Sequence, residues 1–198
     1  MLPVVTATEA ECRKYLETLR WPAGITCLRC GSHPVSRVAR RRQYECTRCG
    51  FQFSVTSGTV LHDSHLPLSK WFVAVFLLCA SANGMSANQL KRTLKVSYKT
   101  AWYLSHRIRA AVAEAAMAPP GRAEGPEWRG RADLAEGAFS MFKRSTVDSF
   151  HQIKPKHLDG YLNEFAWRVN NRGNPHLLRD TLLKLLAAPT LRYRQLTA

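Results

Sequence analysis

The sequence predicts a mainly α-helical protein that carries one small β-rich segment near its N-terminus. Three observations lead to this fold class: a helical apolar pattern at the start, short strand-like runs broken by Gly, Pro and Ser over residues 25–53, and long helical stretches after residue 68. The chain has 198 residues, of which 45% are hydrophobic and 22% are charged, as in ordinary globular proteins. This length fits one large domain or a few small ones.

The charge balance indicates a polyanionic partner. The 29 Lys and Arg residues exceed the 14 Asp and Glu residues, which gives a net charge of +15 and an isoelectric point near 10.1. Nucleic acid is therefore the first candidate partner. Most of the positive excess lies in residues 1–110, so we expect the polyanion to contact mainly this part.

The sequence also excludes some classes of protein. Its longest apolar stretch, residues 71–80, is much shorter than the roughly 20 residues that span a bilayer. The N-terminus lacks the basic and apolar regions of a signal peptide. We therefore expect a soluble, cytoplasmic protein with no membrane partner, and cysteines that stay reduced.

The first helix is predicted over residues 7–19. Thr6 with Glu9 and Thr8 with Glu11 both have capping-box spacing, so two overlapping starts are open. Apolar residues recur at intervals of three and four, so one face of this helix should pack on a neighbour.

Three further helices are predicted after the β-rich segment. Residues 69–82 are apolar nearly all round, which is typical of a buried helix. A capping box opens a short helix over residues 86–94. After a tight turn, Ser97 is expected to cap a longer helix over residues 98–116.

The rest of the chain predicts a linker followed by helices. Residues 117–132 are rich in Pro and Gly, and their acidic residues, Glu124 and Glu127, are interpreted as linker charges. Asn174 is expected to cap the last helix. The helices beyond the linker are predicted at residues 133–145, 155–171 and 175–187. The predicted domains are therefore residues 1–56 (first helix and β-rich segment), 57–116 (helical), 117–132 (linker) and 133–198 (helical).

Four cysteines in two Cys-x2-Cys pairs have the spacing of a structural zinc site. They are Cys27, Cys30, Cys46 and Cys49. Gly31 and Gly50 follow the pairs directly and suit knuckles that need positive φ. A segment this small cannot hold itself by core burial in a reducing compartment, so Zn²⁺ would supply the stability. Two disulfides or a redox pair are the alternatives. Cys12 and Cys79 lie on apolar helix faces and are expected to be core residues.

The β-rich segment also carries a basic cluster between its cysteine pairs. Arginines with an aromatic neighbour, Tyr44, predict a surface that contacts phosphate groups. The alternative is a solvated hairpin that only aids solubility. The DNA-binding candidates here are Arg37, Arg40, Arg41 and Arg42.

The segment 86–111 predicts a helix-turn-helix, packed on the preceding helix. Its shared core is expected to comprise Leu90, Leu94, Val96, Ala101, Leu104 and Ile108. In such motifs, residues at the start of the second helix meet base edges and nearby cations hold phosphates. The DNA-binding candidates are Lys91, Arg92, Ser97, Tyr98, Lys99, Thr100, Arg107 and Arg109, with His106 also expected to face outward. The alternative is an ordinary helical hairpin with a charged face.

Residues 10–115 resemble a known family. A zinc ribbon is followed by residues 51–72, 86–91 and 97–109. These stretches and their order are similar to those in ISXO-like insertion-sequence transposases. This resemblance implies double-stranded DNA, in particular the ends of an insertion element, as the partner.

The C-terminal segment resembles the closing helices of the same family's nuclease domain. The similar stretches are residues 136–144, 149–151, 156–159, 161–165 and 168–172. The resemblance implies a ribonuclease-H-like fold in which three acidic or amide residues bind two divalent metals and a lysine assists. Residues 133–198 would then be the helical remnant of this domain.

The resemblance fails where the family carries its first two catalytic aspartates. They lie on strands between the helix-turn-helix and the closing helices, where this chain has residues 117–132. The remnant candidates are Asp133, where the family usually has Asn, together with Glu136 and Lys143. The alternative role of Asp133 and Glu136 is to place favourable negative charges at a helix start. Mg²⁺ is expected only if a nuclease site is completed, so the chain alone is expected to be inactive.

Three hypotheses follow from the sequence. The chain is a truncated transposase that keeps its DNA-binding modules, an active transposase completed in trans by another polypeptide, or a non-enzymatic DNA-binding regulator. The apolar residues of the C-terminal helices could pack together, or bind a second copy or a full-length transposase.

Overall fold

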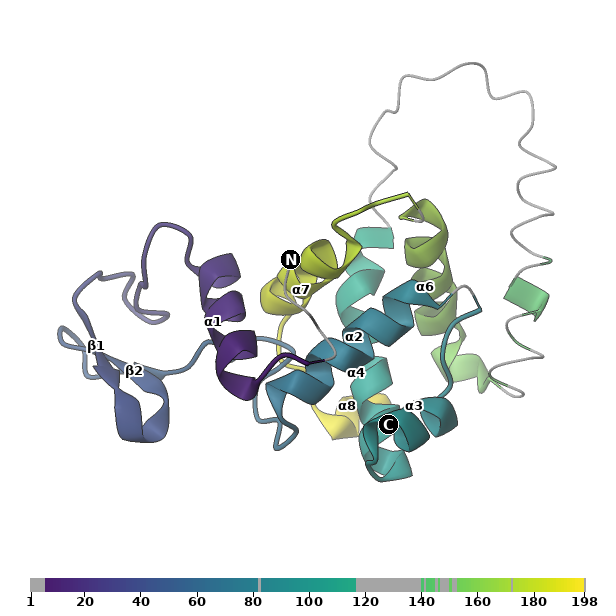
Figure 1. Cartoon of the computed structure of the whole chain (residues 1–198), viewed down its shortest axis with the longest axis horizontal. Helices are drawn as coiled ribbons and strands as arrows, with labels where there is room; N and C mark the ends of the chain where they lie inside the picture. The colour runs from purple at the N-terminus through teal and green to yellow at the C-terminus, as the bar shows by residue number, and fades with distance from the viewer. Residues whose placement is uncertain are drawn as a thin grey trace, which may run out of the picture.

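The computed structural model describes residues 6–197 apart from 82, 117–139, 141, 145, 147–149, 151–152 and 172. This described part is mostly helical and has one three-stranded sheet, which confirms the predicted fold class. The sheet lies at one end of the molecule beside the first helix, and the other helices form the body (Figure 1).

Helix α1 (Glu9–Arg20) uses the second of its two predicted starts. The hydroxyl of Thr8 accepts a hydrogen bond from the N–H of Glu11, and the Glu11 carboxylate accepts one from the N–H of Thr8 at 2.7 Å. This capping box satisfies backbone donors that would otherwise be orphaned. Cys12 and Leu16 are fully buried, so the expected apolar face packs on α2 (Leu68–Ala80).

The sheet is an antiparallel meander of β1 (Val35–Val38), β2 (Gln43–Cys46) and β3 (Gln52–Phe53), with the short helix η1 (Ala39–Arg41) in the first turn. It has a small aromatic core of its own, in which Trp21 contacts Tyr44 and Phe53 with ring centroids 5.7 and 6.0 Å apart. Tyr44 is therefore a core residue and not part of the basic surface, because β2 turns its ring inward.

The predicted helix-turn-helix consists of α3 (Ala87–Leu94) and α4 (Tyr98–Ala116), packed on α2. The capping box of Ser86 and Gln89 opens α3, and the Ser97 hydroxyl accepts from the N–H of Thr100 at 3.1 Å to open α4. Lys95 adopts a left-handed conformation with φ of 51°, which makes the tight turn. The predicted shared core residues are buried, with Val96 partly buried.

The C-terminal segment contains η3 (Pro155–His157), α6 (Leu158–Asn170), α7 (Leu177–Ala187) and α8 (Tyr193–Thr197), the last of which the sequence did not predict. Helix α7 begins two residues later than expected. Asn174 does not cap it, because its side-chain oxygen accepts from the N–H of His176 at 2.8 Å and closes the preceding turn. Most of the helix predicted at residues 133–145 lies outside the described residues.

One hydrophobic core joins helices from both ends of the chain. Leu182 and Leu185 of α7 are fully buried in the same cluster as Leu16 of α1 and Trp71 of α2. Figure 1 shows α7 beside α1 and α2, with α6 alongside α4. The C-terminal helices thus pack directly on the helix-turn-helix.

A buried charge cluster fastens α6 to α4. It consists of Arg109, Glu164 and Arg168, whose exposed fractions are 1%, 3% and 6%. The Nε group of Arg109 donates to one oxygen of Glu164, and the other oxygen lies 3.5 Å from Nε of Arg168. Arg168 also donates to the carbonyl of Ser81 at 3.1 Å. The Tyr161 ring lies 3.9 Å from the Arg109 guanidinium carbon. We call the three charged residues the Arg–Glu–Arg cluster.

Replacing Glu164 with Gln should destabilise the protein by about 3–5 kcal/mol, because two buried guanidinium groups lose their counter-charge. Urea unfolding of the zinc-loaded protein, followed by circular dichroism, measures this change. Asp159→Asn is the matched control, since Asp159 is an exposed carboxylate on the same helix and its loss should change stability by less than about 0.5 kcal/mol. Equal effects of the two substitutions would show that the cluster does not hold α6 in place.

Candidate zinc centre and nucleic-acid interface

The two cysteine pairs lie on knuckles with matching backbone hydrogen bonds. In the first knuckle, Gly31 donates to the carbonyl of Cys27 at 2.9 Å, and in the second, Gly50 donates to the carbonyl of Cys46 at 2.9 Å. The φ angles of Gly31 and Gly50 are 69° and 66°, which glycine adopts without strain. The predicted need for glycine after each pair is confirmed.

The knuckles bring the four thiols into one cluster, and the four sulfur atoms lie within 4.8 Å of one another. The Sγ atoms of Cys27 and Cys49 are 3.6 Å apart, as are those of Cys30 and Cys46. Four thiolates bound tetrahedrally to Zn²⁺ would be about 3.8 Å apart, from Zn–S bonds of about 2.3 Å. The donor set and its spacing therefore fit a structural zinc ion.

The geometry does not fit the two alternatives. All six cysteines are free, and the close sulfur contacts run between the knuckles and not within a Cys-x2-Cys pair. Cys12 is fully buried in the helical core, and Cys79 contacts the Thr181 hydroxyl at 3.3 Å, so neither belongs to the cluster.

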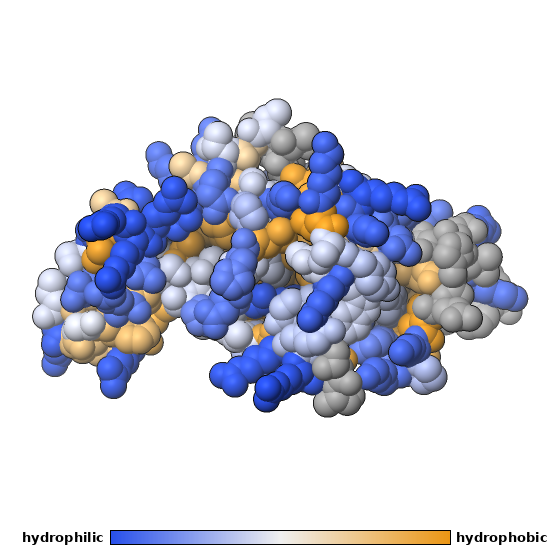
Figure 2. Space-filling model, turned by 90° about the horizontal axis from the view of Figure 1, so that it is seen from below, coloured by the Kyte–Doolittle hydropathy of each residue, from blue (hydrophilic) through white to orange (hydrophobic). Residues whose placement is uncertain are grey.

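The ribbon arginines project from the sheet and its first turn. Hydrophilic side chains extend from this end of the molecule in Figure 2. Arg41 donates to the side chain of Gln52 at 3.3 Å, which leaves its guanidinium at the surface. The exposed candidates are Arg37, Arg40, Arg41 and Arg42. Burial, with Glu17 beside the hydroxyl, raises the pKa of Tyr44 to about 12, in agreement with its place in the core.

The start of α4 and the adjoining part of α3 form a second basic surface. Lys91, Arg92 and Lys99 are exposed, and Tyr98 is 49% exposed. Ser97 and Thr100 hydrogen-bond to each other at 2.8 Å within the helix cap, so their hydroxyls are engaged there. The Lys99 ammonium lies 4.7 Å from the centroid of the Tyr193 ring of α8.

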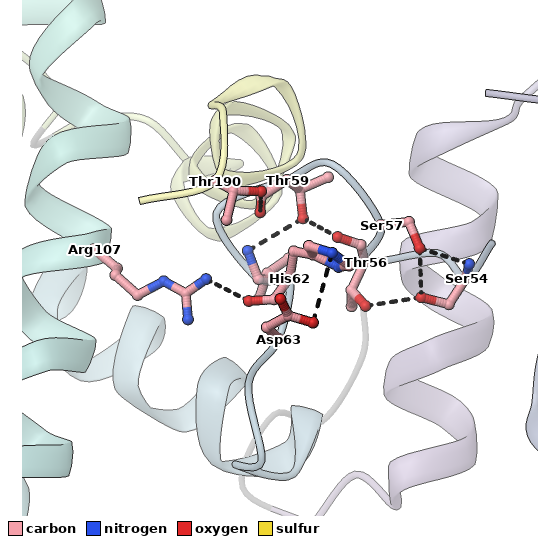
Figure 3. Close-up of polar contacts among 9 residues, drawn as sticks. Ser54, Thr56, Ser57, Thr59, His62, Asp63, Arg107 and Thr190 are labelled. Carbon is pink, nitrogen blue, oxygen red and sulfur yellow. Dashed lines mark hydrogen bonds and ion pairs between the residues drawn. The ribbon is translucent and has the colours of Figure 1, made fainter. Parts of the chain in front are cut away.

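The structure buries His106, Arg107 and Arg109. The prediction that these residues face outward is therefore wrong. Arg109 belongs to the Arg–Glu–Arg cluster. Arg107 is 2% exposed and donates to the carbonyl of His62 at 2.6 Å, as Figure 3 shows. The comparison with helix-turn-helix motifs placed them at the surface, but α6 packs on this half of α4, and Arg107 contacts the segment before α2.

The segment that Arg107 holds links the ribbon to α2. Thr190, after α7, donates to the carbonyl of Thr59 at 3.1 Å (Figure 3). Arg20 of α1 donates to the carbonyl of Ser57 at 2.8 Å. Three distant parts of the chain therefore fix residues 54–63. The sequence alone did not indicate any of these three partners.

His106 of α4 packs against His157 of η3. The rings of His106 and His157 are 4.6 Å apart, and Trp102 lies against His106 at 4.2 Å. Burial, together with the nearby charges of Arg109 and His157, lowers the pKa of His106 to about 3. His106 is therefore neutral in the folded protein at neutral pH.

Most of the candidate nuclease residues lie outside the described part of the chain. Asp133 and Glu136 fall in the undescribed residues, as do Glu124 and Glu127, while Lys143 is described and exposed. Among the described residues, the cysteine cluster is the one group of three or more potential metal ligands within reach of a single ion. Within the same residues, no helix is both long and apolar enough to cross a membrane.

Sequence reasoning missed Glu164, Arg168 and Tyr161 as the groups that receive Arg109. The sequence contains one signal for this contact. Glu164 and Arg168 are four residues apart on a predicted helix, next to Phe165 and Trp167. A charge pair among large apolar residues is typical of a buried contact.

Sequence comparisons agree with this architecture. A family model described as a transposase zinc-ribbon domain matches residues 7–52, and one described as an ISXO2-like transposase domain matches residues 126–170. An uncharacterized protein in the transposable element ISH50 of Halobacterium salinarum is 32% identical over 130 residues. The alignment covers 64% of this chain and 42% of that relative, so the chain spans less than half of the relative's length. No solved structure matches.

These matches confirm the resemblance to insertion-sequence transposases that the motifs indicated. The cysteine cluster and the first match together support a zinc ribbon with a structural Zn²⁺.

The zinc ribbon predicts one bound zinc per chain, measurable by elemental analysis of the purified protein. Cys46→Ser should abolish this binding and open residues 25–53 to proteolysis, because metal supplies most of the segment's stability. Cys79→Ser is the control, since this thiol lies outside the cluster. Unchanged zinc content or protease resistance in Cys46→Ser would contradict the assignment.

The buried histidine predicts a loss of stability in acid. An unfolded histidine binds a proton near pH 6.5, whereas folded His106 does so only near pH 3. The unfolded state therefore binds more protons between these values, and the free energy of unfolding should fall as the pH falls from 6.5 towards 3. His106→Gln should flatten this dependence in urea unfolding curves, while His176→Gln, at an exposed site, should leave it unchanged.

Proposed function

We propose that this chain is a DNA-binding transposase-family protein whose ribbon and helix-turn-helix bind double-stranded DNA at the ends of an insertion element. The observation that carries the proposal is the exposed basic surface on both modules. It comprises Arg37, Arg40, Arg41, Arg42, Lys91, Arg92 and Lys99. Because two transposase family models match the same chain, DNA binding is the most direct use of this surface.

The proposed DNA contacts of the helix-turn-helix fall into two chemical groups. Lys91, Arg92 and Lys99 carry long flexible cations suited to phosphate groups. Tyr98 begins α4 and projects half-exposed, where a side chain can reach a base edge. The proposed contact set excludes Arg107 and Arg109, because they are committed to the interior.

The proposal includes no strand transfer by this chain alone. A two-metal centre needs carboxylates from several elements, and the acidic residues between α4 and residue 133 are Glu124 and Glu127. The three described strands all belong to the ribbon, and α6 packs directly on α4. The described residues thus do not offer a set of ligands that fits a pair of Mg²⁺ ions. On this interpretation the chain is a truncated transposase that occupies element ends and can inhibit a full-length relative.

A regulator that binds a promoter is the second interpretation of the same surface. Footprinting of the zinc-loaded protein on DNA that flanks its gene, with Mg²⁺ present, separates the interpretations. Protection of inverted repeats without nicks supports the proposal, protection of a promoter supports the regulator, and site-specific nicks would show an active site. No protection would overturn DNA binding.

Lys99→Ala should weaken binding to duplex DNA about three- to tenfold and reduce the slope of log affinity against log salt by about one, since one phosphate contact is lost. Fluorescence anisotropy at several salt concentrations measures both quantities. Lys14→Ala is the matched control, because Lys14 is equally exposed but lies on α1. An unchanged slope in Lys99→Ala would remove the start of α4 from the interface.

A further inference from the structure

A cleft of about 780 Å³ opens between the helix-turn-helix and the C-terminal segment. Its walls come from α3, the start of α4, residues 150, 153–154, 156–157 and 161, and α8. The volume is within the range of pockets that hold a small organic molecule. The cleft exists because α6 is fastened to α4, which brings residues distant in sequence to face the start of α4.

Cations line this cleft from two sides. Arg92 and Lys99 come from the helix-turn-helix, and Lys154 and Lys156 come from the opposite wall. None of the described lining residues is acidic. The pKa of His157, also in the wall, is lowered by partial burial and by Lys156, Lys154 and Arg109 nearby. The cleft therefore carries a positive potential that favours an anion.

Aromatic rings share the same cleft. Tyr98 and Tyr193 are 49% and 37% exposed, and Trp102 and Tyr161 lie deeper. The rings of Trp102 and Tyr193 are 6.1 Å apart and meet edge to face. Aromatic rings next to cations are the combination on which unpaired bases stack while their phosphates are neutralised.

We propose that this cleft binds an unpaired nucleotide of a DNA strand that leaves the duplex held by α3 and α4. Lys154 and Lys156 neutralise the phosphates, and Tyr98 and Tyr193 offer their faces to the base. The position supports this ligand, because Arg92, Tyr98 and Lys99 belong both to the proposed duplex contact and to the lining of the cleft. The inference rests on the proposed duplex binding and adds an adjoining site for single-stranded DNA.

The test compares two probes by fluorescence anisotropy: a blunt DNA duplex, and the same duplex with a single-stranded extension of a few thymidines. The zinc-loaded wild-type chain should bind the extended probe about tenfold more tightly, as expected for one stacked base. Lys154→Ala and Tyr193→Leu should reduce this advantage to less than about twofold and leave blunt-duplex affinity nearly unchanged. Lys14→Ala should preserve the advantage.

The outcomes separate the two proposals. If wild type binds both probes equally, or if Lys154→Ala and Tyr193→Leu keep the full advantage, the cleft is not a nucleotide site and duplex binding stands. If thymidine monophosphate binds but the extension confers no advantage, the site serves a free nucleotide and the inference is overturned. If wild type binds neither probe, both the proposed function and this inference fail.

Discussion

The ion pair between Arg109 and Glu164 is the contact that determines how α6 lies on α4. A guanidinium group that is 1% exposed costs several kcal/mol unless a counter-charge reaches it, and Glu164 supplies that charge from α6. The pair gives little net stability over an apolar contact, but it penalises any arrangement that separates the helices. It therefore fixes α6 on α4 and, with it, Tyr161 and His157 beside the helix-turn-helix.

This contact divides α4 into two functional halves. Its second half is an interior helix, where Arg107 holds the carbonyl of His62 and so ties the segment after the ribbon to the helical body. Its first turn stays open, with Tyr98 and Lys99 exposed. The same sequence motif thus serves the core at one end and the proposed nucleic-acid surface at the other, because the partner helix covers only part of it.

The features that sequence predicted well are local. The capping boxes at Thr8 and Ser86 and the glycines of the knuckles depend on residues a few positions apart, so spacing alone determines them. The cysteine cluster joins distant residues, but metal-ligand chemistry allows few other uses for that spacing. The partners of Arg107 and Arg109 lie 45 and 55 residues away, and no local pattern shows whether an arginine on a helix meets water or a buried carboxylate.

The distribution of charge refines what the net charge of +15 means for binding. Composition counts every arginine equally, yet Arg107, Arg109 and Arg168 are buried and engaged with carbonyl or carboxylate oxygens, and Arg20 is partly buried on the carbonyl of Ser57. These cations organise the fold, and the three buried ones cannot contact a phosphate group directly. Exposed cations lie on the ribbon turn, on α3 with the start of α4, and on the cleft wall that includes Lys154 and Lys156, as well as elsewhere on the described surface. The buried arginines help to position the helices that carry the proposed DNA-contacting residues of α3 and α4, while their own guanidinium groups contact protein oxygens.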